Sequence, residues 1–188
     1  MRVIAGEAKG RRLVAPRGSG TRPATDRIRE TLFAILEPSL GGARVLDLFA
    51  GAGTMGIEAL SRGAAHAMFV ERGAVALDAL RRNLEITHFA DRSEVVAANV
   101  IAFLERGARP GPFDLVLVDP PFADIAILEA TLAHPGLAAA LRDDATVVAR
   151  FLRKHPPTTP PASHVERTKR IGEEDLLFLR YRGAGGGG

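Results

Sequence analysis

The chain of 188 residues contains no cysteine, which excludes disulfide bonds, thiolate metal sites and cysteine nucleophiles. It also lacks any run of about 18 apolar residues, so we expect no membrane-spanning helix. The opening residues MRVIAGEAKG lack the apolar core of a signal peptide, and we therefore expect a cytoplasmic protein. The five histidines are scattered without a ligand-like pair, and we expect no metal site.

Positive charge is concentrated at the N-terminal end of the chain. Residues 1–29 contain eight arginines and lysines against two acidic residues, a net of +6, whereas the other 159 residues carry a net of −3. Arginine dominates this segment, and its guanidinium suits bidentate contacts to phosphate. We expect residues 1–24 to form a basic arm that binds a polyanion such as nucleic acid. A solvated, solubilising tail is the alternative.

Local patterns at the N-terminal end predict a hairpin and then a helix. Two short apolar pieces, residues 3–5 and 13–15, flank turn residues and predict a small β-hairpin. Thr25 or Asp26 can cap a helix that runs to about Leu36 with one apolar stripe, and Pro38, Gly41 and Gly42 should end it. Outside that stripe, we expect Arg27 and Arg29 to point toward solvent or a ligand.

From residue 43 onward, strands and helices alternate, which predicts a mostly parallel sheet with helices on both faces. The expected strands are 43–49, 66–71, 93–97, 113–118 and 145–151, and the expected helices are 54–62, 73–87, 101–106, 125–134 and 136–141. The proline-rich segment 155–163 predicts a stiff exposed loop, and 165–171 with 175–182 predict a closing antiparallel hairpin. We expect one catalytic domain over residues 25–182 and a disordered glycine-rich tail over 183–188.

The run from Val45 to Gly56, V-L-D-L-F-A-G-A-G-T-M-G, predicts a strand, a glycine turn and the start of a helix. In α/β proteins this arrangement brings the backbone close to a nucleoside-bearing cofactor. Asp47 lies at the end of the strand, where its carboxylate can meet a cationic amino group. Glu71, which ends the next strand 20 residues after Gly51, can accept both hydroxyls of a ribose or cap the following helix.

Two further polar positions follow later strands. Asn99 can hydrogen-bond an adenine amino group, cap the helix after it, or do both. Asp119-Pro120-Pro121-Phe122 follows another apolar strand and suits an enzyme that acts on a nucleobase amine, whose lone pair is delocalised into the ring. The Asp119 carboxylate and the Pro120 carbonyl can accept the two amine hydrogens and favour a more nucleophilic, pyramidal nitrogen. Phe122 can stack on the base, and the alternative is a sharp turn with Phe122 in the core.

These motifs resemble those of known enzymes. D-L-F-A-G-A-G resembles the cofactor loop of S-adenosylmethionine-dependent methyltransferases, and D-P-P-F resembles their amino-group motif. The segments R-V-I-A-G-E-A-K-G-R-R-L, T-R-P-A-T-D-R-I-R-E and D-L-F-A-G-A-G-T-M-G-I-E-A-L-S-R-G-A are similar to the RsmD family over residues 1–182. Members of that family are bacterial enzymes that methylate N2 of a guanine in 16S ribosomal RNA.

The resemblance implies a Rossmann-like class I methyltransferase that acts on an assembling small ribosomal subunit, and we expect a monomer. It places the cofactor against Asp47, Phe49, Gly51 and Gly53 at its methionine end, Glu71 at its ribose and Asn99 at its adenine. It places the target guanine against Asp119, Pro120 and Phe122, and the RNA against Arg11, Arg12, Arg22 and Arg27. Two departures are an asparagine at 99, where the family usually has aspartate, and the proline-rich loop at 155–163, where a helix is common.

Three other functions fit part of the sequence. A DNA methyltransferase acting on adenine N6 or cytosine N4 would also use Asp-Pro-Pro-Phe, but no separate target-recognition domain is evident. A non-catalytic RNA-binding assembly factor would fit the basic arm, although it would not need Asp47, Glu71 and Asp119. A nicotinamide-dependent oxidoreductase would fit the glycine turn, yet it has no use for the Asp-Pro-Pro-Phe motif.

Overall fold

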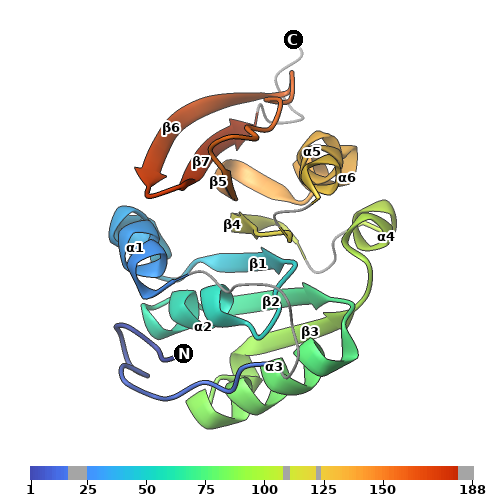
Figure 1. Cartoon of the computed structure of the whole chain (residues 1–188). Coiled ribbons are helices and arrows are strands. Elements are labelled where there is room, and N and C mark those ends of the chain that lie inside the picture. The colour runs from blue at the N-terminus through green and yellow to red at the C-terminus, as the bar shows by residue number, and fades with distance from the viewer. Residues whose placement is uncertain (17–24, 108–110, 122–123, 182–188) are drawn as a thin grey trace. The chain divides into compact units, whose positions relative to one another are not determined.

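The computed structural model describes residues 1–16, 25–107, 111–121 and 124–181. The chain divides into two compact units, Met1–Ala98 and Asn99–Gly188, each built from alternating helices and strands (Figure 1). The expected partition into an arm, a catalytic domain and a tail stays a prediction, and the tail itself lies outside the described residues. Among the described helices, none has the length and apolar character needed to cross a membrane.

The first unit contains a three-stranded parallel sheet. Its central strand β2 (His66–Glu71) pairs with β1 (Arg44–Leu48) on one side and with β3 (Ser93–Ala97) on the other. Helix α2 (Thr54–Ser61) packs on β1 and β2, and α3 (Ala74–Thr87) packs against β3, which follows the 3₁₀ turn Ala90–Arg92. Because helices cover them, β1 and β2 are almost continuously buried, as parallel strands usually are.

Helix α1 (Asp26–Leu40) is capped by Thr25 and is followed by Gly41, as expected. It runs four residues beyond the predicted end at about Leu36, so Pro38 does not end it. Pro38 lies inside the last turn, and the helix continues to Leu40, which is completely buried. Burial of a leucine side chain is worth about 1.5–3 kcal/mol, which offsets much of the roughly 3 kcal/mol cost of a proline in a helix.

The prediction that Arg29 points toward solvent or a ligand is also wrong, because its side chain is 1% exposed. Arg29 lies on a second buried stripe with Phe33, Leu36 and Leu40. Its guanidinium donates to the Asp26 carboxylate at 2.8 Å and to the backbone carbonyl of Arg2 at 2.7 Å, and it also pairs with the Glu58 carboxylate at 3.5 Å. The buried Arg29 side chain therefore joins α1, α2 and the N-terminal segment through polar contacts.

Residues 1–16, here called the N-terminal segment, reverse direction at a turn around Gly6 to Gly10. An antiparallel bridge joins Arg2 to Arg12, and the Val3 amide donates to the Arg11 carbonyl at 3.0 Å. This bridge stands where the hairpin was expected, and neither flank extends into a regular strand. The segment runs past α2 to α3, and the side chains of Val3, Ala8 and Leu13 are buried (Figure 1).

The described residues of the second unit contain four strands. β4 (Phe113–Val118) pairs in parallel with β5 (Leu141–Leu152), and β7 (Glu174–Tyr181) is antiparallel to both β5 and β6 (Ser163–Ile171). Helices α4 (Val100–Glu105), α5 (Ile125–Ala133) and α6 (Pro135–Ala139) pack on one another. Residues 153–162 connect β5 to β6 without helix or regular strand, as their prolines predicted.

Every strand predicted from residue 43 onward is present, and the predicted fold class is confirmed. β5 begins four residues earlier than expected, at Leu141, where its register with β4 is irregular and Asp144 adopts a positive φ of 64°. The register that matters for function aligns Val118 with Ala149, so the residues that follow them, Asp119 and Arg150, come side by side.

Candidate functional site

The turn after β1 is anchored by Asp47 at the strand end. This side chain is 1% exposed, and its Oδ2 accepts a hydrogen bond from the Gly56 amide in the first turn of α2 at 2.9 Å. A Cβ on Gly56 would come within 2.4 Å of the Phe69 ring and 3.1 Å of the same Asp47 oxygen. The glycine therefore allows the helix to begin close against the carboxylate and β2.

The same turn is tied to the end of β2 by Glu71. Its Oε2 accepts from the Gly51 amide at 2.9 Å, and its Oε1 accepts from the amides of Arg72 and Gly73 at 2.8 and 2.7 Å. Arg72 and Gly73 precede α3, and no described side chain caps the first amides of this helix, so the predicted helix-capping role of Glu71 is not observed. One carboxylate organises the two backbone turns that end neighbouring parallel strands, which is the edge where α/β sheets bind ligands.

The backbone of the glycine turn is unusual at three of the predicted cofactor residues. Phe49, Gly51 and Gly53 all have positive φ values, of 62°, 56° and 79°. A non-glycine residue in this conformation is uncommon and often marks a functional turn. At Gly53 a Cβ would come within 2.3 Å of Leu80 in α3, whereas at Gly51 it would meet no heavy atom within 4 Å. The turn is therefore packed against α3 at Gly53 and open at Gly51.

Asn99 lies at the start of the second unit and caps α4. Its Oδ1 accepts from the amides of Ile101 and Ala102 at 2.9 and 3.3 Å, and the residue is exposed. This is the capping alternative that the sequence suggested. A contact with adenine stays a prediction.

The Asp-Pro-Pro turn directly follows β4. The Asp119 side chain is 16% exposed and receives two hydrogen bonds from the Arg150 guanidinium, Nε to Oδ1 at 2.7 Å and Nη2 to Oδ2 at 3.0 Å. The Nη1 of the same arginine donates to Glu174 at 2.8 Å. Burial raises the pKa of the Asp119 carboxyl, and the adjacent Arg150 opposes that rise. Pro120 is buried, and Phe122 lies outside the described residues.

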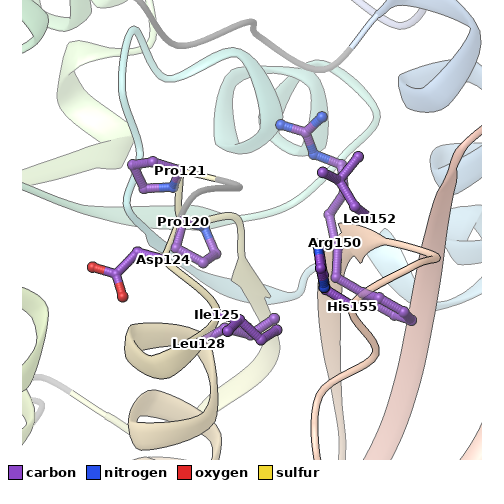
Figure 2. Close-up of a pocket in the computed structure, with 9 residues that line it drawn as sticks. Pro120, Pro121, Asp124, Ile125, Leu128, Arg150, Leu152 and His155 are labelled. Carbon is purple, nitrogen blue, oxygen red and sulfur yellow. The ribbon is translucent and has the colours of Figure 1, made fainter.

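A pocket adjoins this turn (Figure 2). Pro120, Pro121 and residues of α5 lie on one side of it, and Arg150, Leu152 and His155 lie on the other (Figure 2). The complete lining is Pro120, Pro121, Asp124, Ile125, Leu128, Arg150, Phe151, Leu152 and His155. Its walls are mostly apolar, with a few polar groups among them.

The predicted RNA-binding arginines differ in their surroundings. Arg12 and Arg27 are exposed, whereas Arg11 is partly buried and donates to the backbone carbonyl of Ile86 in α3. Arg22 lies outside the described residues. Among the described members of this set, Arg12 and Arg27 are therefore the exposed ones.

Sequence reasoning missed the polar residues that join the N-terminal segment to α2. The Glu58 carboxylate, which is completely buried, accepts from the amides of Ile4 and Ala5 at 2.9 and 3.0 Å. The Ser61 hydroxyl accepts from the Ala8 amide at 3.0 Å. A glutamate and a serine inside an otherwise apolar, fully buried helix are the signal that could have revealed these contacts.

Asn83 of α3 was missed as well, and it joins the N-terminal segment to the glycine turn. This completely buried amide accepts from the Val14 amide at 2.7 Å and donates to the Val14 carbonyl at 3.0 Å. Its nitrogen also donates to the carbonyl of Ala52, within the glycine turn, at 2.9 Å. The Asn83 side chain therefore hydrogen-bonds both the N-terminal segment and the candidate cofactor turn.

Comparison with known proteins gives consistent matches along the chain. Residues 1–180 match a family model described as conserved hypothetical protein 95. Ribosomal RNA small subunit methyltransferase D of Escherichia coli K12 is 38% identical over 174 residues, which span 92% of this chain and 86% of that protein. YlbH of Bacillus subtilis is 38% identical over 185 residues, which span 97% of this chain and 100% of that protein.

Solved structures agree with these matches. The structure of yhhF from Escherichia coli is 37% identical, has a TM-score of 0.82, and aligns over 97% of this chain and 98% of its own. A more distant methyltransferase fold, crystallised in complex with S-adenosylhomocysteine, is 14% identical with a TM-score of 0.64, covering 80% of this chain and 48% of its own, and shares the fold alone. From the family match and the close relatives, the chain belongs to the RsmD family of ribosomal RNA small subunit methyltransferases.

Proposed function

We propose that this protein transfers a methyl group from S-adenosylmethionine to the N2 amine of a guanine in 16S ribosomal RNA. The proposal that an amine is the acceptor rests on one observation, the Asp119 carboxylate at the end of β4, which is oriented by two hydrogen bonds beside a buried proline. A relative with 38% identity carries the name of a small subunit methyltransferase, which supports 16S RNA as the substrate.

The residues of the first unit fit the cofactor. A carboxylate has about four lone-pair sites, and three backbone amides occupy three of those of Glu71, which leaves acceptor capacity for a ribose hydroxyl. The open side of Gly51 leaves room for a ligand next to the backbone. Asp47 would meet the cationic amino group at the methionine end.

When bound, S-adenosylmethionine supplies an electrophilic methyl group on a sulfonium. Asp119 and the Pro120 carbonyl would accept the two hydrogens of the guanine amine and localise its lone pair on nitrogen. The amine nitrogen held in this way would form a bond to the methyl carbon as the bond from that carbon to the sulfonium sulfur broke. S-adenosylhomocysteine would leave, and the methylated nitrogen would release one proton to solvent. The negative Asp119 would stabilise the positive charge that develops on nitrogen.

The RNA would be held by the basic residues around the N-terminal segment, chiefly the exposed Arg12 and Arg27. A stacked or paired guanine has to be extruded to reach Asp119, which costs a few kcal/mol. An unpaired guanine in an assembling subunit would reduce that cost.

The test is methyl transfer from labelled S-adenosylmethionine to three substrates, followed by nucleoside analysis. These substrates are small ribosomal subunits from cells lacking the enzyme, naked 16S RNA and duplex DNA. We expect N2-methylguanosine in the RNA or the subunits. Methylated adenine or cytosine in the DNA, without methylated guanine in the RNA, would contradict the proposal.

The role of Asp119 is tested with Asp119→Ala. We expect no methyl transfer while calorimetry finds the dissociation constant for S-adenosylhomocysteine unchanged, because the residue contacts the acceptor and not the cofactor. Asp114→Ala is the matched control, since Asp114 lies on the same strand and pairs with Arg142 at 3.2 Å. It should retain activity, and normal turnover by Asp119→Ala would refute the mechanism.

A further inference from the structure

We propose that Arg150 is a positioning residue for methyl transfer, which fixes the plane of the Asp119 carboxylate so that its remaining lone pairs face the acceptor amine. This inference rests on the proposed function. It assigns a role to a β5 residue outside the Asp-Pro-Pro-Phe motif.

The geometry is that of a bidentate pair. Arg150 follows Ala149, whose register partner is Val118, so the arginine lies directly beside Asp119 on the neighbouring parallel strand. Two donors of one rigid guanidinium bind the two carboxylate oxygens at 2.7 and 3.0 Å. A planar fork of this kind prevents the carboxylate from rotating, which a single hydrogen bond would not do.

The arginine is itself held in place. Its side chain is 6% exposed, and its third donor binds Glu174 of β7 at 2.8 Å. β7 is the antiparallel neighbour of β5, and the register aligns Leu152 with Glu174. Three adjacent strands, β4, β5 and β7, thus contribute one residue each to the cluster Asp119, Arg150 and Glu174.

The pairing leaves acceptor capacity for a substrate. Each carboxylate oxygen has two lone pairs, and the Arg150 fork uses one on each oxygen of Asp119. With both acids ionised, the three-residue cluster carries a net charge of −1. That charge suits an amine nitrogen that becomes positive as it is methylated.

Arg150 also favours the ionised form of Asp119. Burial raises the pKa of this carboxyl, and the nearby Glu174 raises it further, whereas Arg150 lowers it through its charge and its hydrogen bonds. Asp124, which caps α5, and His155 after β5 are the other titratable groups that line the adjoining pocket. A protonated Asp119 would donate a hydrogen bond where the amine needs an acceptor, so loss of Arg150 should leave the acceptor intact only at higher pH.

The activity test compares Arg150→Met and Arg150→Lys with wild type across about pH 6 to 9.5, with kcat and KM measured separately on the RNA substrate. At about pH 7 we expect Arg150→Met to lower kcat at least about tenfold, and the deficit to shrink as pH rises, because the variant lacks the guanidinium that lowers the pKa of Asp119. Arg150→Lys should recover part of the activity, because it restores the positive charge without the fork.

Arg153→Met is the matched control. Arg153 follows β5 closely and pairs with Asp175 at 3.0 Å, but it does not contact Asp119 in the described structure. It should keep the wild-type pH profile. A kcat deficit in Arg150→Met that Arg153→Met shares, or that Arg150→Lys does not reduce at any pH, would overturn the proposal, because a merely structural role predicts that result.

A second measurement needs no substrate. The Asp119 carboxyl carbon is labelled with ¹³C, assigned by its loss in Asp119→Asn, and titrated in wild type and in Arg150→Lys and Arg150→Met. We expect its pKa to increase from wild type through Arg150→Lys to Arg150→Met, and identical titrations would overturn the proposal. If wild type transferred no methyl group to guanine, the proposed function would fail while this titration still decided whether Arg150 controls Asp119.

Discussion

The close approach of Gly6 to α2 offers a sharp test of how the N-terminal segment is attached. Gly6 has a φ of 81°, and a Cβ placed on it would lie 1.7 Å from the carbonyl oxygen of Ser61 and 2.2 Å from its carbonyl carbon. Because those atoms belong to the backbone of a buried helix, the N-terminal segment has to move in Gly6→Ala. Gly10 has nearly the same φ, 82°, but a Cβ there would meet nothing within 4 Å.

The two substitutions therefore share a conformational cost and differ in one contact. An alanine at positive φ costs about 1 kcal/mol, which is all that Gly10→Ala should lose. Displacement of the segment in Gly6→Ala would also break the hydrogen bonds from the Glu7 and Ala8 amides to Ser61, of 2.8 and 3.0 Å. At about 1 kcal/mol for each bond, Gly6→Ala should lose about 3 kcal/mol of unfolding free energy.

These costs can be measured by urea denaturation followed by circular dichroism, and by thermal melting. For a chain of this size, 1 kcal/mol corresponds to about 2–4 °C, so we expect a loss of about 3 °C for Gly10→Ala and about 9 °C for Gly6→Ala. Equal destabilisation of the two variants would refute the reasoning, because it would mean that the segment does not lie against Ser61.

Two further predictions concern the cofactor and the RNA. Asn83→Ala leaves the Val14 and Ala52 backbone groups without their buried partner, so it should lower the unfolding free energy by about 2–3 kcal/mol. We also expect it to weaken S-adenosylhomocysteine binding in calorimetry. Unchanged binding would mean that Asn83 does not support the glycine turn. Replacing the exposed Arg12 and Arg27 by alanine should flatten the slope of log RNA affinity against log salt by up to about 2, and an unchanged slope would favour a solvated tail.

The errors in predicting the fold occurred where burial competed with a local rule. A proline such as Pro38 usually ends a helix, but α1 continues past it to Leu40, whose side chain is buried. Arg29 carries a charge that usually stays in water, yet Asp26, Glu58 and the Arg2 carbonyl supply enough partners to bury it. Neither outcome depends on neighbours in sequence alone, and so neither could be predicted from local patterns.

The same difference between neighbouring and distant residues explains which parts of the candidate site could be predicted. Strand β1, its glycine turn and α2 are contiguous, so the sequence predicted their order and placed Asp47 and Glu71 at strand ends. The contacts of Glu58, Ser61 and Asn83 span 31 to 69 residues of chain, and no periodicity connects such distant positions.

By itself, the sequence determined the alternation of strands and helices, the glycine turn and the Asp-Pro-Pro motif, because these depend on side-chain periodicity and on residues that are covalent neighbours. Only the tertiary structure decided that Arg150 forms two hydrogen bonds with Asp119, 31 positions away in sequence, and that hydrogen bonds join the basic N-terminal segment to α2 and α3. The physical reason is that packing between distant segments sets the strand register and the pairing of buried charges. Such packing lowers the free energy of the whole fold, and it produces no pattern among residues that are neighbours in sequence.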